Sequence, residues 1–225
     1  MTQERIFPDE LVFPPRTLLR CGAVVELLKE CGLQGKRGIL VHGRSLDTCG
    51  TLKKILAAAP KGLKVESWEH PGGEPTLVHV SDLLRAARAY NAEWIAGVGG
   101  GSVLDLAKTA AGLLHARLKP VEYHDGAALG PSRVPFLAVP TTAGTGSEAT
   151  TVCVLTNSET GVKKSFRHPS FMARLVILDA DLLRDCPRTV IAASGMDAFT
   201  QAVESYVSVG ANWFSDQMAV KAMTL

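Results

Sequence analysis

The chain has 225 residues, of which 46% are hydrophobic and 20% charged, and its formal net charge at pH 7 is +2. This balance is typical of a globular core, and with no dense run of Lys and Arg it argues against nucleic acid or anionic membranes as partners. The sequence contains no run of about 18 apolar residues that could span a membrane, and its polar N-terminus lacks the apolar core of a signal peptide. Five cysteines without a CxxC pair favour reduced thiols and a cytoplasmic location.

The first part of the chain alternates short apolar strands with amphipathic helices. Residues 1–20 are interrupted by prolines and are expected to form an edge segment. The patterns that follow predict a helix over 21–31, a strand over 38–42, a helix over 52–59, a strand over 64–68 and a helix capped by Thr76. Such alternation predicts βαβ units and a parallel sheet, which binds ligands beyond the carboxyl ends of its strands.

The stretch Trp94–Lys108 carries the strongest signal for a ligand. An apolar strand over 94–98 ends in Gly99, Gly100 and Gly101, and a helix over 102–114 follows at once, with Ser102 as its expected cap. A strand, a glycine turn and a helix bring backbone N–H groups and a positive helix end up to a phosphate. Taken alone, the turn is equally compatible with a tight connection that binds nothing.

The second part of the chain adds further donors and then changes character. A strand over 134–140 runs into residues 141–148, where small hydroxyl residues and glycines alternate. A β-hairpin with arms at 152–155 and 162–166 is predicted next, and a strand over 175–179 completes the sheet. From about residue 188 only helical patterns remain. We therefore expect an α/β domain over 1–186 and the first helices of an all-helical domain over 187–225.

Two helices are expected in that last region. The first, over 194–208, has an apolar face of Phe199, Ala202, Val203 and Tyr206 that is expected to face a core. The second, over 213–225, reaches the last residue without a stop signal, and we interpret this as a truncated second domain. Asp197 and Gln201 are spaced i, i+4 on the first helix, so their side chains are expected to meet.

Five motifs together resemble one family. They are GGGSVLDLAK at 99–108, PTTAGTGSEAT at 140–150, GVKKSFRHP at 161–169, LVILDADLL at 175–183 and SGMDAFTQAVESYVS at 194–208. In this order they resemble the iron-containing (group III) NAD(P)-dependent alcohol dehydrogenases, relatives of glycerol dehydrogenase and dehydroquinate synthase. The resemblance implies a Rossmann-like α/β domain followed by a helical domain, and hydride transfer between a nicotinamide cofactor and an alcohol/aldehyde or ketone pair. It also implies a homo-oligomer, a dimer or larger.

The resemblance assigns cofactor roles to individual residues. Gly99, Gly100, Gly101 and Ser102 are implied to bind the pyrophosphate, with Asp105 in the same site. The adenosine and phosphate side is implied to be lined by Thr141, Thr142 and Thr145. Lys163, on the hairpin, is implied to approach the ribose or a phosphate. Backbone N–H groups, hydroxyls and an ammonium group are what a dinucleotide diphosphate requires.

The residues after the first strand bear on the choice between NAD and NADP. NAD-preferring members of the family often carry an acidic residue there that binds the ribose hydroxyls, whereas this chain has Gly43, Arg44 and Ser45. Without that carboxylate a 2′-phosphate is not repelled, and Arg44 or Ser45 could contact it. We therefore expect NADP in preference to NAD.

The expected metal site departs from the family pattern. Many members bind Fe²⁺ or Zn²⁺ through an Asp and a His four residues later. Asp197 matches the first ligand, but Gln201 stands in place of the His, and an amide is a weaker ligand. Three possibilities stay open for these two candidate catalytic residues: metal binding through Asp197, a metal-free reductase of the maleylacetate reductase type, or a simple hydrogen-bonded pair. A nucleotide-binding fragment without activity is a further alternative.

Overall fold

A computed structural model describes residues 6–184 and 186–225 of the chain. Residues 1–5 of the expected edge segment, and Asp185 beside the expected domain boundary, lie outside the described residues. The boundary at 186/187 stays a prediction.

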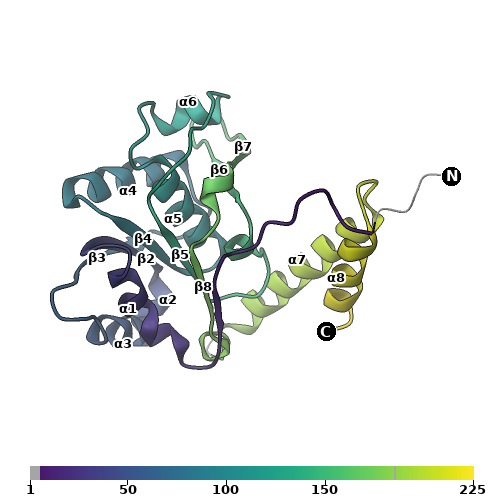
Figure 1. The fold of residues 1–225 in the computed structure, drawn as a ribbon, viewed down its shortest axis with the longest axis horizontal. Coiled ribbons are helices and arrows are strands. Elements are labelled where there is room, and N and C mark those ends of the chain that lie inside the picture. The colour runs from purple at the N-terminus through teal and green to yellow at the C-terminus, as the bar shows by residue number, and fades with distance from the viewer. Residues whose placement is uncertain (1–5, 185) are drawn as a thin grey trace.

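A parallel sheet forms the centre of the molecule (Figure 1). Its six strands run in the order β1-β8-β5-β4-β2-β3, and every neighbouring pair is parallel. The strands are β1 (Thr17–Leu19), β2 (Arg37–Gly43), β3 (Lys64–His70), β4 (Trp94–Gly99), β5 (Phe136–Pro140) and β8 (Leu175–Leu178). The predicted parallel α/β fold is confirmed, and the expected edge segment supplies the edge strand β1.

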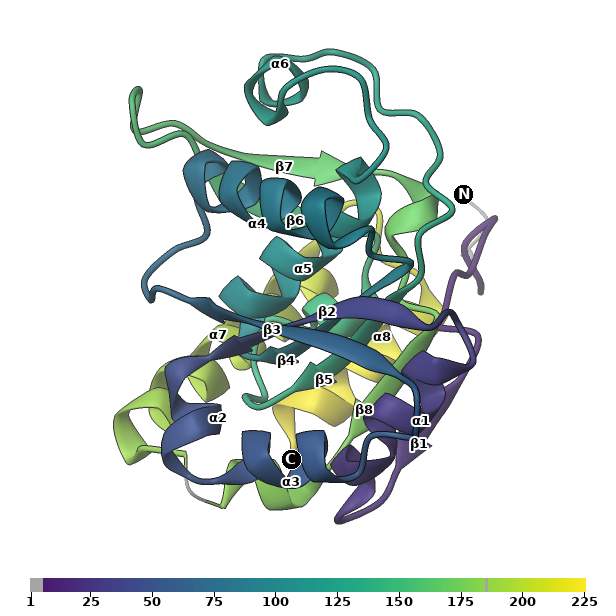
Figure 2. The same cartoon turned by 90° about the vertical axis from the view of Figure 1, so that its left-hand side faces the viewer.

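Both faces of the sheet are covered (Figure 2). One face packs against η1 (Ala23–Glu26), α1 (Leu27–Gly32), α2 (Arg44–Thr48) and α3 (Thr51–Ala57). The other packs against α4 (Leu77–Tyr90), α5 (Gly101–Leu113) and the hairpin of β6 (Val152–Thr156) and β7 (Lys163–Arg167). The short helices α6 (Pro120–His124), η2 (Ser147–Ala149), η3 (Pro169–Phe171) and η4 (Ala180–Leu183) lie in the connections. Because side chains alternate along a strand, Leu40 faces the first group, whereas Ile39 and Val41 face the second.

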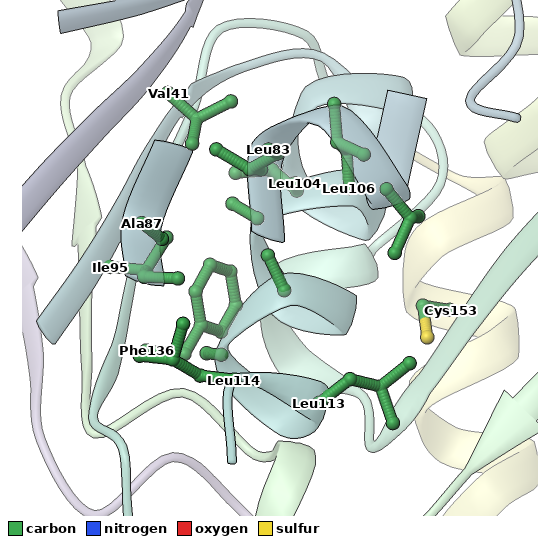
Figure 3. Packing of buried hydrophobic residues seen from close by; sticks show 14 of the residues in the cluster. Val41, Leu83, Ala87, Ile95, Leu104, Leu106, Leu113, Leu114, Phe136 and Cys153 are labelled. Atoms are coloured by element: carbon green, nitrogen blue, oxygen red, sulfur yellow. The ribbon is translucent and has the colours of Figure 1, made fainter. Parts of the chain in front are cut away.

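The core on the α4 and α5 side holds the glycine turn in place. Leu83 of α4, Leu104 of α5 and Phe136 of β5 are almost fully buried there, around the strand residue Ile95 (Figure 3). Each such side chain contributes about 1.5–3 kcal/mol through removal of its apolar surface from water. The turn between β4 and α5 is therefore fixed by two elements that are themselves buried.

Two helices lie to one side of the sheet (Figure 1). They are α7 (Arg188–Val207) and α8 (Trp213–Met223), and they pack against each other. The N-terminal segment reaches them, because the Phe7 ring lies 6.0 Å from the Trp213 ring and 5.7 Å from the Phe214 ring. None of the helices that the structure describes combines the length and apolar character that a membrane span requires.

The expected core face of α7 is wrong. Of its four residues only Ala202 is buried, while Phe199 is 46% and Tyr206 50% exposed. The described residues place no element over these two rings, so the apolar pattern lies at the surface of this chain. The helix also begins at Arg188 rather than near residue 194, because Pro187 serves as its N-cap and Gly195 does not interrupt it.

Other boundaries differ by a few residues. The expected helix over 21–31 is divided into η1 and α1, the strand at 64 continues to His70, and the strand expected from 134 begins at Phe136. Thr76 caps α4 as predicted, since its hydroxyl accepts a hydrogen bond from the His79 backbone N–H. The five cysteines are all free thiols, as their spacing indicated.

Candidate functional site

The predicted ligand-binding loops meet at one edge of the sheet. Gly99 at the end of β4 pairs with Pro140 at the end of β5, and β2, which ends at Gly43, is the other neighbour of β4. The Thr141 backbone N–H donates to the Gly99 carbonyl oxygen at 3.0 Å. The glycine turn and the threonine-rich loop are therefore joined directly, at the edge where parallel sheets bind ligands.

The first turn of α5 has no side-chain cap. The expected cap at Ser102 is wrong: the N-cap position belongs to Gly100, and Ser102 lies inside the first helical turn. The first N–H groups of a helix have no partner within it, and here no side chain caps them. With the positive end of the helix dipole, they form a suitable site for an anion.

The three glycines of the turn serve different purposes. A Cβ atom on Gly99 would lie 2.6 Å from Val103 Cβ, and one on Gly101 would lie 2.6 Å from Thr145 Cγ2. A Cβ atom on Gly100 would lie 3.3 Å from the Thr142 hydroxyl. Gly99 and Gly101 are therefore required for packing in the protein itself, whereas at Gly100 a small side chain would require only a slight shift of Thr142.

A hollow of about 460 Å³, which we call the α7 hollow, lies on one side of the turn, between α5, the hairpin and α7. It brings together seven of the predicted site residues: Gly101, Ser102, Asp105, Thr145, Lys163, Asp197 and Gln201. Glu74, Ser147 and Thr150 also line it.

A second hollow of about 420 Å³, which we call the α2 hollow, lies on the other side of the turn. It contains the predicted residues Ser45, Gly100, Thr141 and Thr142, with Leu46 and Leu182 as apolar lining. Gly43 and Gly99 line neither of these two hollows. The predicted residues thus divide between two spaces that meet at Gly100 and Gly101.

An ion pair lies at the mouth of the α7 hollow. Lys163 Nζ donates to Glu74 Oε1 at 2.8 Å, and the Thr156 hydroxyl donates to Glu74 Oε2 at 2.9 Å. The hydrogen bond from Lys163 is the main cause that lowers the pKa of the Glu74 carboxyl. Sequence reasoning missed Glu74, because it comes from a loop 89 residues away from its partner and no spacing connects the two.

The floor of the α7 hollow is a buried polar network. Asp105 Oδ1 accepts a hydrogen bond from the Ser147 hydroxyl at 2.6 Å, and Asp105 Oδ2 accepts one from the Val154 backbone N–H at 2.9 Å. Burial raises the pKa of the Asp105 carboxyl, while these hydrogen bonds and the charge of Lys108 act in the opposite direction. Burial lowers the pKa of the Lys108 amine.

The loop after β5 approaches α7 closely at Gly144. A Cβ atom on Gly144 would lie 2.8 Å from Ser194 Cβ and 2.9 Å from the Ser194 carbonyl oxygen. Only a glycine allows this approach without a shift of the backbone. The contact joins two of the sequence motifs and sets the distance between the sheet edge and the helix that carries Asp197.

Asp197 and Gln201 meet as their spacing predicts. Gln201 Nε2 donates to Asp197 Oδ2 at 2.9 Å, and both side chains are exposed. The described residues hold no group of three or more His, Cys, Asp or Glu side chains that could bind a metal ion. The two residues therefore do not make a metal centre by themselves, and metal binding stays a prediction.

The end of β2 has a basic rather than an acidic side chain. Arg44 Nε lies 3.3 Å from Glu69 Oε1 on β3, and the Arg44 side chain is largely exposed. Gly43 precedes it in an extended conformation. The Glu69 carboxylate at this corner is thus paired with a cation.

Comparisons with known proteins identify the family. A model described as "Iron-containing alcohol dehydrogenase" matches residues 14–180, and one described as "Fe-containing alcohol dehydrogenase family, C-terminal" matches residues 191–225. The chain belongs to the iron-containing alcohol dehydrogenase family. The resemblance inferred from the motifs is confirmed, together with the Rossmann-like fold.

Individual members of the iron-containing alcohol dehydrogenase family are similar over nearly the whole chain. The probable alcohol dehydrogenase EutG of Salmonella typhimurium is 36% identical, over 94% of this chain and 54% of its own length. Long-chain-alcohol dehydrogenase 1 of Geobacillus thermodenitrificans is 35% identical, over 96% and 55%. The structure of sulfoacetaldehyde reductase from Bifidobacterium kashiwanohense in complex with NAD⁺ matches with a TM-score of 0.89 and 28% identity, over 96% and 58%. The chain spans about half the length of the curated relatives it matches.

Proposed function

We propose that this chain binds NAD(P) across its glycine turn and serves hydride transfer between the nicotinamide and an alcohol/aldehyde or ketone pair. The observation that carries the proposal is the division of the predicted residues between two hollows that meet at Gly100 and Gly101. A dinucleotide has two halves joined by a diphosphate, and this arrangement offers a space for each half on either side of an uncapped helix end.

The two hollows differ in chemistry, and this difference supports one orientation of the proposed cofactor. The α2 hollow is lined mainly by hydroxyls and apolar side chains, which suit an adenosine; its one carboxylate, that of Asp181, is paired with Arg184. The α7 hollow holds Asp105, Lys163 and Asp197, which suit the reacting half and its substrate. The diphosphate then lies at the first turn of α5, and Lys163 reaches the ribose of the nicotinamide half.

NADP is the proposed cofactor in preference to NAD. Gly43 supplies no carboxylate to repel a 2′-phosphate, and Ser45 lines the α2 hollow as a hydroxyl donor. The guanidinium of Arg44 is exposed beside this corner. A phosphate dianion would gain charge-assisted hydrogen bonds from both side chains.

Asp197 and Gln201 are the proposed contacts for the reacting oxygen. The Gln201 amide retains one N–H beyond the bond to Asp197, and the Asp197 carboxylate retains free lone pairs. An alcohol hydroxyl would donate to Asp197 and accept from Gln201 while its carbon delivers a hydride to the nicotinamide; the hydroxyl proton leaves to solvent. Because the described residues do not make a metal centre, we derive no step through a metal.

A dinucleotide-binding protein without turnover is the second candidate. It is favoured by the exposure of Asp197 and Gln201, which line the α7 hollow, since hydride transfer benefits from exclusion of water. The substrate, a homo-oligomeric assembly and a cytoplasmic location stay predictions.

Three measurements test these functions. Titration with NADPH should show one saturable site per chain, and oxidation of small alcohols by NADP⁺ should then separate turnover from binding alone. Metal analysis of the purified protein and of the Asp197→Ala variant decides whether Asp197 is a ligand: a metal content that is present and falls with the substitution supports it. Failure to bind either dinucleotide would refute both candidates.

A further inference from the structure

Lys108 is a lysine without any exposed surface. It lies on α5 among apolar residues, and its side chain is fully buried. A buried ammonium group costs several kcal/mol unless it is paired and hydrogen-bonded. A lysine is almost never fully buried in a protein core unless its ammonium group is paired.

The ammonium group of Lys108 holds one segment of the chain. It donates to the Ser147 carbonyl oxygen and to the Val152 carbonyl oxygen, both at 2.6 Å. It also donates to the hydroxyls of Ser147 at 3.0 Å and Thr150 at 3.3 Å. One lysine thus fixes both ends of the segment 147–152, which runs from the single turn of η2 to the first residue of β6.

Asp105 holds the same segment through two further hydrogen bonds. It lies three residues before Lys108 on the same helix, and it holds the Ser147 hydroxyl and the Val154 backbone N–H through its two oxygens. The Ser147 hydroxyl therefore bridges the two charged groups, because it accepts from Lys108 and donates to Asp105. The charge of Asp105 in turn offsets part of the cost of burying the amine.

The segment held in this way is a wall of the α7 hollow. Ser147, Thr150, Val152 and Val154 all line that hollow, together with Asp105, whereas Lys108 itself does not. We propose that Lys108 is a positioning residue for cofactor binding: from inside the protein it fixes the wall 147–154 and the carboxylate of Asp105 in the form that receives the nicotinamide half. The identity of the ligand rests on the proposed function; the role in fixing the wall does not.

Substitution by Met separates the charge from the volume. Lys108→Met keeps an unbranched side chain of similar length but leaves the carbonyl oxygens of Ser147 and Val152 without their donor. Lys164→Met is the matched control, since Lys164 also donates to a backbone carbonyl, but that carbonyl belongs to His124, which does not line the hollow.

Hydrogen exchange in the free protein tests the wall itself. Amides of residues 147–154 should exchange at least about tenfold faster in Lys108→Met than in the wild type, which corresponds to loss of one charged hydrogen bond, and should be unchanged in Lys164→Met. Unchanged exchange in Lys108→Met overturns the proposal. This measurement needs no cofactor, so it stands even if the chain binds no dinucleotide.

Cofactor affinity tests the role in binding. At a temperature where the variants are folded, the Kd for NADPH should rise about tenfold or more in Lys108→Met and less than twofold in Lys164→Met. Asp105→Asn should raise the Kd for NADPH in the wild-type background. In the Lys108→Met background the same substitution should raise the Kd by less than about twofold, because both residues act through the same wall. If the two substitutions multiply the Kd independently, or if the Kd is unchanged in Lys108→Met, a positioning role is contradicted.

If Lys108→Met does not fold, Ser147→Ala is the substitute, because it removes only the bridging hydroxyl. It should raise the hydrogen-exchange rates and the Kd in the same direction as Lys108→Met, but by smaller factors. Unchanged exchange rates and Kd in Ser147→Ala would count against the proposal.

Discussion

Gly100→Ala adds one methyl group at the place where we expect the cofactor diphosphate. Gly100 has φ −72° and ψ −178°, which any residue adopts, so the substitution causes no backbone strain. The added Cβ would lie 3.3 Å from the Thr142 hydroxyl, a contact that a shift of a few tenths of an ångström relieves. The free protein should therefore keep its fold.

The expected effect on binding is much larger than the effect on stability. Stability should change by less than about 1 kcal/mol, since a Gly→Ala change in a compatible conformation also reduces the entropy of the unfolded chain. A diphosphate displaced from the helix end loses two or so charge-assisted hydrogen bonds, each about 1.5–3 kcal/mol. The Kd for NADPH should accordingly rise by roughly two orders of magnitude or more.

Thermal unfolding and a fluorescence titration with NADPH measure the two effects separately. Gly99→Ala is the matched comparison: its Cβ would lie 2.6 Å from Val103 Cβ, so it should lower the stability by about 1–3 kcal/mol through overpacking. If Gly100→Ala binds NADPH as tightly as the wild type, the diphosphate does not lie at this turn and the reasoning fails.

Three further substitutions examine other parts of the site. Gly43→Asp should shift the preference from NADP⁺ toward NAD⁺ by about tenfold, measured as the ratio of the two Kd values, because it restores a carboxylate that repels a 2′-phosphate; an unchanged ratio would remove the basis for preferring NADP. Gly144→Ala should displace α7, since its Cβ would lie 2.8 Å from Ser194, and so reduce any turnover more than cofactor affinity. Lys163→Met should return the pKa of Glu74 toward its ordinary value, and NMR of the Glu74 carboxyl carbon measures this change. In the wild type the Lys163–Glu74 contact is fully present at a pH above the ordinary pKa of a glutamate. It is lost as the pH falls through the lowered pKa of Glu74.

Local patterns were sufficient to predict the sheet and the glycine turn. The alternation of apolar strands with helices, and three glycines at a strand end, depend on residues close together in the sequence, and both were found where they were expected. The cap at Ser102 is wrong because the same glycines place the N-cap two residues earlier, at Gly100. The backbone N–H groups of Val103 and Leu104 both donate to the Gly100 carbonyl oxygen, which shows this earlier start.

Contacts between distant residues could not be predicted in this way. The Lys163–Glu74 pair joins residues 89 apart, and the bond from Lys108 to Ser147 joins residues 39 apart. The first depends on how the hairpin packs beside the loop before α4, and the second on how η2 packs against α5, which no spacing in the sequence encodes. The predicted core face of α7 is wrong for a related reason. Periodicity predicts that Phe199 and Tyr206 share a side of the helix, but it does not predict that another element covers them.

A crystal structure of the chain with NADP⁺ would show where the two halves of the cofactor bind. We expect the diphosphate at the first turn of α5, the adenosine in the α2 hollow and the nicotinamide in the α7 hollow beside Asp105 and Lys163. A dinucleotide bound at another place, or with its two halves exchanged between the hollows, would contradict this placement.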